Sequence, residues 1–342
     1  MSELLVCGCG AVSPAGWGVA ALREALARGE PLPVRDFPRP GWTKALRVRS
    51  VPAPPARPAF FTHARLRRTS PIAQFGVAAA LEALGSDHEP VIQKRLRLGI
   101  VLCVMSGCVN YSRRFYDETL KNPATASPLV FPETVFNAPA SHLASLLGAS
   151  GMNYTLVGDP STFLQGLALA GEWLADQRVD GCLVIGAEEI DWMTAEAFAM
   201  FQHNVIVGDG AAAVYLRTAG TNPLARVQAI TNPFIFSKNQ TRMDAARRAR
   251  AELGPPLPGE LLCDGLLGDL PIDRAERKAW QDWPTGRFSP KTILGEGLAA
   301  GGGWQCVAAI DALHQGRAKS VTVSLVGCNQ QAIAARFLAA DQ

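Results

Sequence analysis

This chain of 342 residues lacks several patterns, and each absence excludes a class of protein. No apolar run is long enough to cross a bilayer, and no charged region precedes the first apolar stretch, so we expect a soluble cytoplasmic protein without a membrane partner. The eight cysteines form no C-x-x-C pair and only five histidines accompany them, so we expect no metal site and no cofactor. The net charge of +3 is too small to indicate nucleic-acid binding.

Apolar residues make up 48% of the chain and aromatic residues only 7%, which is typical of a compact α/β protein. Strand-like and helix-like segments alternate. In the first part we expect strands at 4–10, 98–104, 154–157 and 181–186, a glycine-bent strand pair at 205–216, helices at 18–28, 65–84 and 139–147, and an irregular proline-rich excursion at 39–60. In the second part we expect strands at 225–231, 260–263 and 321–329 and helices at 241–253, 273–283 and 301–314. Two such runs predict duplicated halves, 1–220 and 221–342, in a layered arrangement.

The segment 154–174 predicts a strand, a tight turn and a core helix. A β-rich run ends at Gly158-Asp159-Pro160, and apolar residues at helical spacing follow it. Asp159 is a good N-cap because its carboxylate can accept hydrogen bonds from unpaired backbone N–H groups of the first turn. Pro160 suits the first helical position, where an N–H has no partner in any case.

Several stretches resemble the β-ketoacyl synthase family of the thiolase fold, and their order spans most of the chain. They are GAVSPAG at 10–16, RLRRTS at 65–70, FPETVFNAPAS at 131–141, GAE at 186–188 and SLVGCN at 324–329. The resemblance implies an α/β, thiolase-like fold whose two duplicated halves form α-β-α-β-α layers.

The resemblance also locates the family's catalytic positions, and none keeps its residue. Counting back the family's interval from GAE reaches Pro160, with Ser161 next to it, where the nucleophilic cysteine is expected. Asp264 stands in place of the histidine of a His-Gly-Thr motif, and Glu296 replaces the second histidine, although Lys291 of that motif is retained. The resemblance therefore implies that the Cys-His-His triad is absent and that the chain is inactive alone.

The replaced groups also suit the family's chemistry poorly. Proline removes a backbone N–H that ketosynthases use in the oxyanion hole. Two ionised carboxylates would repel the enolate that forms during decarboxylation, which neutral imidazoles stabilise. Either carboxyl could be protonated in an apolar pocket and act as an acid or base. Alternatively, Lys291 neutralises Glu296 and the two form a structural pair.

The first functional hypothesis is a chain-length-factor-like subunit that pairs with a catalytic ketosynthase in type II polyketide, aryl polyene or fatty-acid-like biosynthesis. By resemblance, the pocket or its gate would be formed by Phe136, Asn137, Phe163 and Leu325. An acidic acyl carrier protein is the expected second partner. Three basic clusters are either solvated helix faces or docking sites for it, at 63–68, 113–114 and 247–250.

Two other hypotheses stay open. Ser161 could be the nucleophile of an acyltransferase or thioester hydrolase, with Asp264 or Glu296 as base. A serine nucleophile normally needs a histidine, and no histidine falls at an expected site, although His142 is nearest; the five are His63, His88, His142, His203 and His314. The chain could also be a homodimeric scaffold or an acyl-carrier binder without a partner synthase.

Overall fold

The computed structural model describes residues 3–201, 204–268 and 270–340. The strands that lie before residue 220 in the large sheet are β1 (Leu4–Ser13), β2 (Gly16–Trp17), β5 (Leu98–Val104), β6 (Asn153–Val157), β7 (Gly181–Glu188) and β9 (Gly210–Arg217). Those after it are β10 (Ala225–Ile230), β11 (Phe234–Ile235), β12 (Leu261–Cys263), β13 (Arg287–Phe288), β14 (Ser320–Val326) and β15 (Gln331–Ala339). They hydrogen-bond in the order β13-β12-β14-β15-β10-β1-β9-β7-β5-β6, with β11 and β2 beside this path.

The two parts of this sheet repeat one topology. With the short strands β2 and β11 left aside, each part has five strands. In each part the first strand pairs antiparallel with the fifth, and the fifth pairs antiparallel with the fourth: β1-β9-β7 in one part and β10-β15-β14 in the other. The second strand then pairs in parallel with both the fourth and the third. Antiparallel pairing of β1 with β10 joins the parts. This repetition supports the division near residue 220, which remains a prediction.

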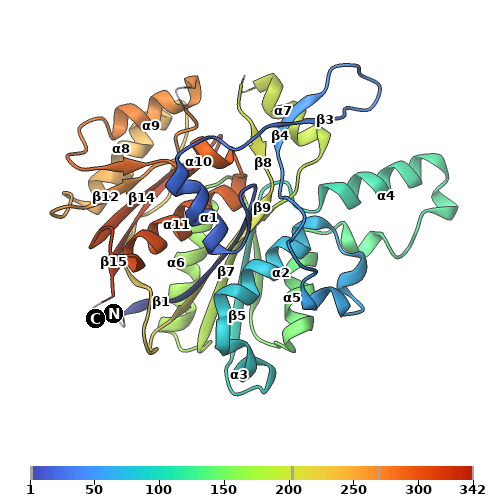
Figure 1. Cartoon of the computed structure of the whole chain (residues 1–342), viewed down its shortest axis with the longest axis horizontal. Helices are drawn as coiled ribbons and strands as arrows, with labels where there is room; N and C mark the ends of the chain where they lie inside the picture. Colours follow the sequence, from blue (N-terminus) through green and yellow to red (C-terminus); the bar gives the residue numbers. More distant parts are fainter. Residues whose placement is uncertain (1–2, 202–203, 269, 341–342) are drawn as a thin grey trace.

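The helices form three layers about the two parts of the sheet (Figure 1). Outside the first part lie α2 (Pro71–Leu84) and α5 (Ala138–Leu147), and outside the second lie α8 (Arg242–Leu253) and α9 (Arg274–Ala279). Between the parts lie α6 (Thr162–Ala175) and α11 (Leu298–His314), whose apolar side chains belong to one core with both parts. The predicted thiolase-like, layered α/β fold is confirmed.

Three glycines near the start of α11 allow this helix to lie very close to its neighbours. A Cβ atom on Gly302 would stand 2.3 Å from the carbonyl oxygen of Pro160, and one on Gly303 would stand 2.7 Å from Cβ of Ala212. A Cβ atom on Gly301 would stand 3.2 Å from Glu296 Oε1. The glycine run therefore places the first turns of α11 directly against the turn that precedes α6.

Some predicted elements differ from the structure. The helix expected at 65–84 begins only at Pro71, because Pro71 occupies its first position and Ser70 before it is extended. The strand pair expected at 205–216 does not form: β8 (Val207–Gly208) pairs with β4 (Leu46–Arg49), which lies in the supposedly irregular stretch at 39–60. β4 also pairs with β3 (Arg35–Phe37).

The remaining α-helices are α1 (Val19–Arg28), α3 (His88–Ile92), α4 (Val109–Lys121), α7 (Trp192–Phe201) and α10 (Pro290–Leu294), of which α10 is largely buried. The sequence analysis did not predict α4, which projects from the body of the molecule (Figure 1).

Candidate functional site

The turn between β6 and α6 differs in detail from the prediction. The helix begins at Thr162 and its N-cap residue is Ser161, so Asp159 is not the N-cap and Pro160 is not the first helical residue. The N–H of Thr162 donates to the carbonyl oxygen of Asp159 at 2.9 Å, and that of Leu164 donates to Ser161 at 3.1 Å. The chain thus makes a tight turn through Pro160 before the helix starts.

The Asp159 carboxylate holds this turn against a second loop. It accepts hydrogen bonds from the Ser161 hydroxyl and from the Ser161 N–H at 3.2 Å. Its other oxygen accepts the N–H of Gln330, between β14 and β15, at 2.9 Å. A Cβ atom on Gly327 would stand only 1.7 Å from this oxygen, so glycine there is required for the contact. Asp159 is fully buried and connects two segments that are remote in sequence.

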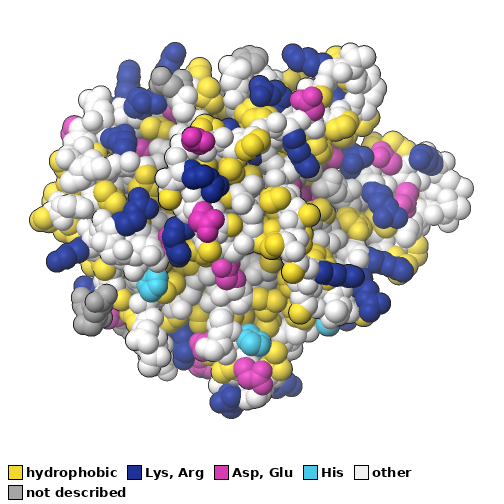
Figure 2. Space-filling view, viewed as in Figure 1, with side chains coloured by type: hydrophobic (Ala, Val, Ile, Leu, Met, Phe, Trp, Pro, Cys, Tyr) yellow, Lys and Arg dark blue, Asp and Glu magenta, His cyan; other side chains and the backbone are white. Residues whose placement is uncertain are grey.

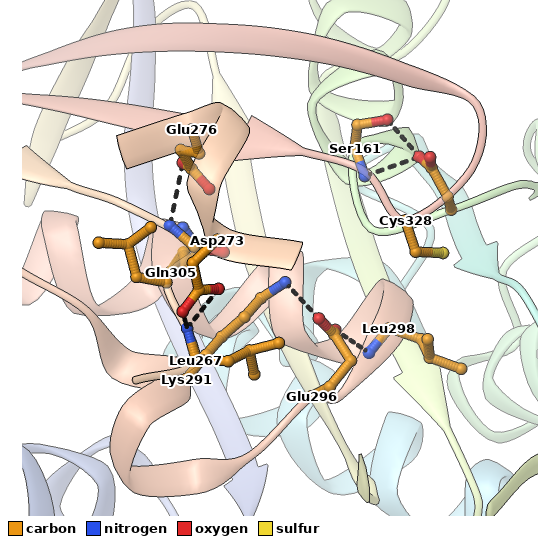
Figure 3. Close-up of polar contacts among 12 residues, drawn as sticks. Ser161, Leu267, Asp273, Glu276, Lys291, Glu296, Leu298, Gln305 and Cys328 are labelled. Atoms are coloured by element: carbon orange, nitrogen blue, oxygen red, sulfur yellow. Dashed lines mark hydrogen bonds and ion pairs between the residues drawn. The ribbon is translucent and has the colours of Figure 1, made fainter. Parts of the chain in front are cut away.

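Ser161 is closed off from solvent. Its exposed fraction is 0%, and its hydroxyl donates to Asp159 (Figure 3). His142, the nearest histidine candidate, instead contacts the Glu133 carboxylate at 2.8 Å in the segment around α5. Among the described residues no histidine makes a hydrogen bond to Ser161, and His203 lies outside them. Ser161, the alternative nucleophile, therefore has a carboxylate partner, and no histidine of the described residues is bonded to it.

Lys291 and Glu296 form the expected ion pair. Lys291 Nζ lies 2.9 Å from Glu296 Oε2, and their side chains are only 3% and 5% exposed. The other Glu296 oxygen accepts the Leu298 N–H at 2.8 Å, so the carboxylate also caps the start of α11 (Figure 3). Both oxygens are thus occupied by fixed donors. The burial of both side chains and the two donors to Glu296 favour the interpretation of this pair as structural.

Asp264 is held by different neighbours. The Ser289 hydroxyl donates to Asp264 Oδ1, and Arg287 Nη1 lies 3.6 Å from Oδ2. Burial raises the pKa of Asp264, whereas Ser289 and Arg287 lower it. The Asp264 charge raises the pKa of Glu276, and the Asp273 charge raises the pKa of Asp264, whereas Glu296 contributes to neither shift. The two catalytic-position carboxylates therefore do not act as one pair.

The sequence analysis missed two carboxylates that fix the loop after β12. Glu276 accepts the Gly265 N–H at 3.1 Å and the Ser324 hydroxyl at 2.6 Å. Burial, and then the Asp264 charge, raise its pKa to about 7. Asp273 accepts the N–H of Leu267 at 3.0 Å and those of two further loop residues. Acidic residues three apart at a predicted helix start were the available signal.

The four predicted pocket or gate residues do not converge within the chain. Phe163 and Leu325 are buried in the central core, where both pack beside the glycine run of α11, and their assignment to a pocket stays a prediction. Phe136 is exposed, and its ring packs against Gly107. Asn137 is exposed at the N-cap of α5 and lines a surface pocket of about 460 Å³.

Cys328 lies in the loop after β14, and its thiol interacts electrostatically with the Glu296 and Asp159 carboxylates. It is half-buried and its Sγ lies 4.0 Å from Met105 Sδ. Burial, then the Glu296 and Asp159 carboxylates, raise its pKa to about 12. Cys328 is therefore a protonated thiol at neutral pH and a poor substitute nucleophile.

A match to a protein-family model shows which family the chain belongs to. The model for the β-ketoacyl synthase N-terminal domain matches residues 1–205, which is more than half of the chain. The chain belongs to the β-ketoacyl synthase family. A curated β-ketoacyl-[acyl-carrier-protein] synthase III from Granulibacter bethesdensis is 35% identical over 96 residues, which are 27% of this chain and 28% of that protein. The match thus spans little more than a quarter of that relative.

Solved structures with this family's fold match over the whole chain. The ishigamide ketosynthase/chain length factor gives a TM-score of 0.80 at 19% identity, covering 99% of this chain and 100% of that one. A β-ketoacyl synthase from Burkholderia phymatum gives 0.82 at 16% identity, with both chains fully covered. The ketosynthase complexed with a type II polyketide synthase acyl-carrier protein gives 0.79 at 17% identity, with 99% of both chains covered. At these identities the likeness shows the fold.

A membrane-crossing helix is absent from the described part of the chain. None of its helices is both long and apolar enough.

Proposed function

We propose that this β-ketoacyl synthase homologue is catalytically degenerate and acts as a chain-length-factor-like subunit of a heterodimeric ketosynthase. The pathway class would be type II polyketide, aryl polyene or fatty-acid-like biosynthesis. The observation that carries the proposal is the closed turn at Pro160 and Ser161, where the family's cysteine is expected. No thiol stands there, and the only hydroxyl is fully buried and bound to Asp159.

The chemistry of the site supports an inactive chain. Pro160 has no N–H to donate to an oxyanion, and removing one such donor from a working site typically costs about 100- to 1,000-fold in rate. Each Glu296 oxygen already accepts a hydrogen bond, one from Lys291 and one from the Leu298 N–H, which holds the carboxylate in place. Asp264 is bound by Ser289. Each of the three replaced groups thus has an internal partner.

An exposed sheet edge supports a protein partner. β6 is the last strand of the sheet and pairs only with β5 among the described strands. Its Tyr154 and Val157 side chains are 52% and 56% exposed. An unpaired, apolar strand edge usually has to be covered, and pairing with another chain covers it. The similar ketosynthase/chain length factor protein carries both subunit types in its name, so a catalytic ketosynthase subunit is the proposed occupant.

One basic cluster is better suited to an acidic acyl carrier protein than the other two. Arg113 and Arg114 pair with carboxylates of their own chain, as does Arg250, which leaves Arg247 and Arg248 as the exposed arginines of the cluster at 247–250 without an ion pair among the described residues. Within the described residues Arg65, Arg67 and Arg68 are exposed and form no ion pair. Figure 2 shows Lys and Arg side chains gathered on the right of the molecule, below the projecting helix α4. We therefore propose 65–68 as the docking cluster, acting mainly on the association rate.

Co-expression with the ketosynthase encoded beside it tests the proposal. We expect one stable complex with both chains in equal amounts, and an acyl adduct on the partner's cysteine only, measured by intact mass spectrometry. Two separate homodimers would remove the proposed heterodimer. An acyl adduct on this chain, purified alone, would refute its catalytic degeneracy.

A further inference from the structure

A separate cavity of about 310 Å³ lies behind the Lys291–Glu296 pair, on the side of Lys291 away from the turn at Pro160. It is bounded by the end of β4, the segment before β8, the loop after β12 and helix α10. The residues on which the argument depends are Arg49, Ile206, Leu267, Lys291, Thr292 and Gly295. None of the catalytic-position carboxylates lines it.

Arg49 is a buried cation without a counter-ion. The residue is only 9% exposed, and its Nε donates to the Leu32 carbonyl oxygen at 2.8 Å. Among the described residues no carboxylate lies within ion-pair distance of it, and its two Nη groups have no protein partner there. A Cβ atom on Gly295 would stand 3.6 Å from Nη1, so the guanidinium lies against the cavity wall. Burial lowers the pKa of Arg49, and the neighbouring Arg47 charge adds to this.

Lys291 also lines the cavity, and its ammonium group is paired with Glu296. Its ammonium group bonds one Glu296 oxygen and retains other N–H donors. Glu296 does not line the cavity, and neither Asp nor Glu is among the described lining residues. Asp269, between the lining residues Gly268 and Leu270, lies outside the described residues, and the described charged group without a carboxylate partner at the cavity is Arg49. A planar guanidinium with free Nη donors binds carboxylate and phosphoryl oxygens in a bidentate manner, and such charge-assisted bonds are strong when partly desolvated.

We propose that this cavity is a binding site for a compact oxyanion, a small carboxylate or a phosphoryl group, held by the free Nη groups of Arg49 with Lys291 beside it. The volume admits a small molecule and excludes a folded partner. The site lies on one chain, so the inference does not depend on the proposed heterodimer.

The test measures anion binding by the purified chain. Sodium phosphate, sodium malonate and sodium chloride are titrated at equal ionic strength, and the shift in Tm and the heat of binding are recorded. We expect saturable binding of phosphate, malonate or both, and none of chloride. Saturation by phosphate alone assigns a phosphoryl ligand, and saturation by malonate alone assigns a carboxylate.

The variants Arg49→Gln and Arg47→Gln form a matched pair. Arg47 lies two residues away on β4 and is exposed. We expect Arg49→Gln to weaken anion binding about tenfold or more, since a hydrogen bond to a charged group is involved. Arg47→Gln should bind as the wild type does. If Arg49→Gln fails to fold, Arg49→Lys is measured in its place. Lysine keeps the positive charge but lacks the planar pair of Nη donors, so this variant should also weaken anion binding. Equal binding by wild type and the Arg49 variant, or no saturable binding by wild type, would overturn the proposal.

Discussion

Replacing Lys291 by methionine should destabilise the protein strongly, because it leaves the Glu296 carboxylate buried without its cation. The charged atoms are 2.9 Å apart and both side chains are nearly inaccessible. At an effective dielectric constant of about 20, their attraction amounts to about 6 kcal/mol before desolvation is subtracted. Removing one partner of such a pair typically costs about 3–5 kcal/mol, whereas an exposed pair contributes less than about 1 kcal/mol.

The measurement is the free energy of unfolding in urea for wild type, Lys291→Met, Glu296→Gln and the double variant. We expect each single variant to lose about 3 kcal/mol or more. The double variant should regain much of this loss, since glutamine can still accept the Leu298 N–H. Lys44→Met serves as the control, because Lys44 is exposed and such substitutions change stability by less than about 0.5 kcal/mol.

A loss below about 1 kcal/mol in Lys291→Met, or additive losses in the double variant, would refute a buried structural pair. The result also separates the two hypotheses for Glu296. A working acid or base must exchange its proton freely, whereas a carboxylate held by Lys291 and Leu298 contributes to stability. Large coupling between the two positions would favour the structural role.

Three further outcomes are expected. A fluorophosphonate should not label Ser161, because its hydroxyl is fully buried; stoichiometric labelling that Ser161→Ala abolishes would instead support the hydrolase hypothesis. Val157→Asp should weaken binding to a ketosynthase subunit about tenfold or more in light-scattering titrations, since it introduces a charge at the proposed interface; Ile235→Asp, at an equally exposed site on β11, should not. The folded-state pKa of Glu276 is raised to about 7, so its penalty is absent below its ordinary value of 4.5, grows as pH rises toward 7, and is complete above that pH. Unfolding free energy should therefore fall between about pH 4.5 and 7, and Glu276→Gln should flatten this slope; an unchanged slope would contradict it.

The sequence predicted the layered fold well because its strands and helices have distinct apolar periods. It also located Pro160, Ser161 and the Lys291–Glu296 pair, which depend on short-range spacing. It could not locate the partner of Asp159, since Gln330 is 171 residues away and meets it only through the fold. Nor could it show that Phe163 is enclosed in the core, because this depends on the glycines of α11, which let the two core helices approach closely.

If the chain is catalytically degenerate, as proposed, the contacts at the three replaced positions indicate how the fold accommodates the replacements. A nucleophile or general base must keep an unsatisfied lone pair facing substrate, which is costly in a buried site. Here Ser161 donates to Asp159, Asp264 Oδ1 accepts from Ser289, and Glu296 pairs with Lys291, so each position makes an internal contact, although Asp264 Oδ2 has no hydrogen-bond partner. Restoring only a cysteine at Pro160 would leave these contacts in place and supply neither histidine. Activity would therefore require simultaneous changes at several contacts, and for this reason we expect the degenerate state to be stable to single substitutions.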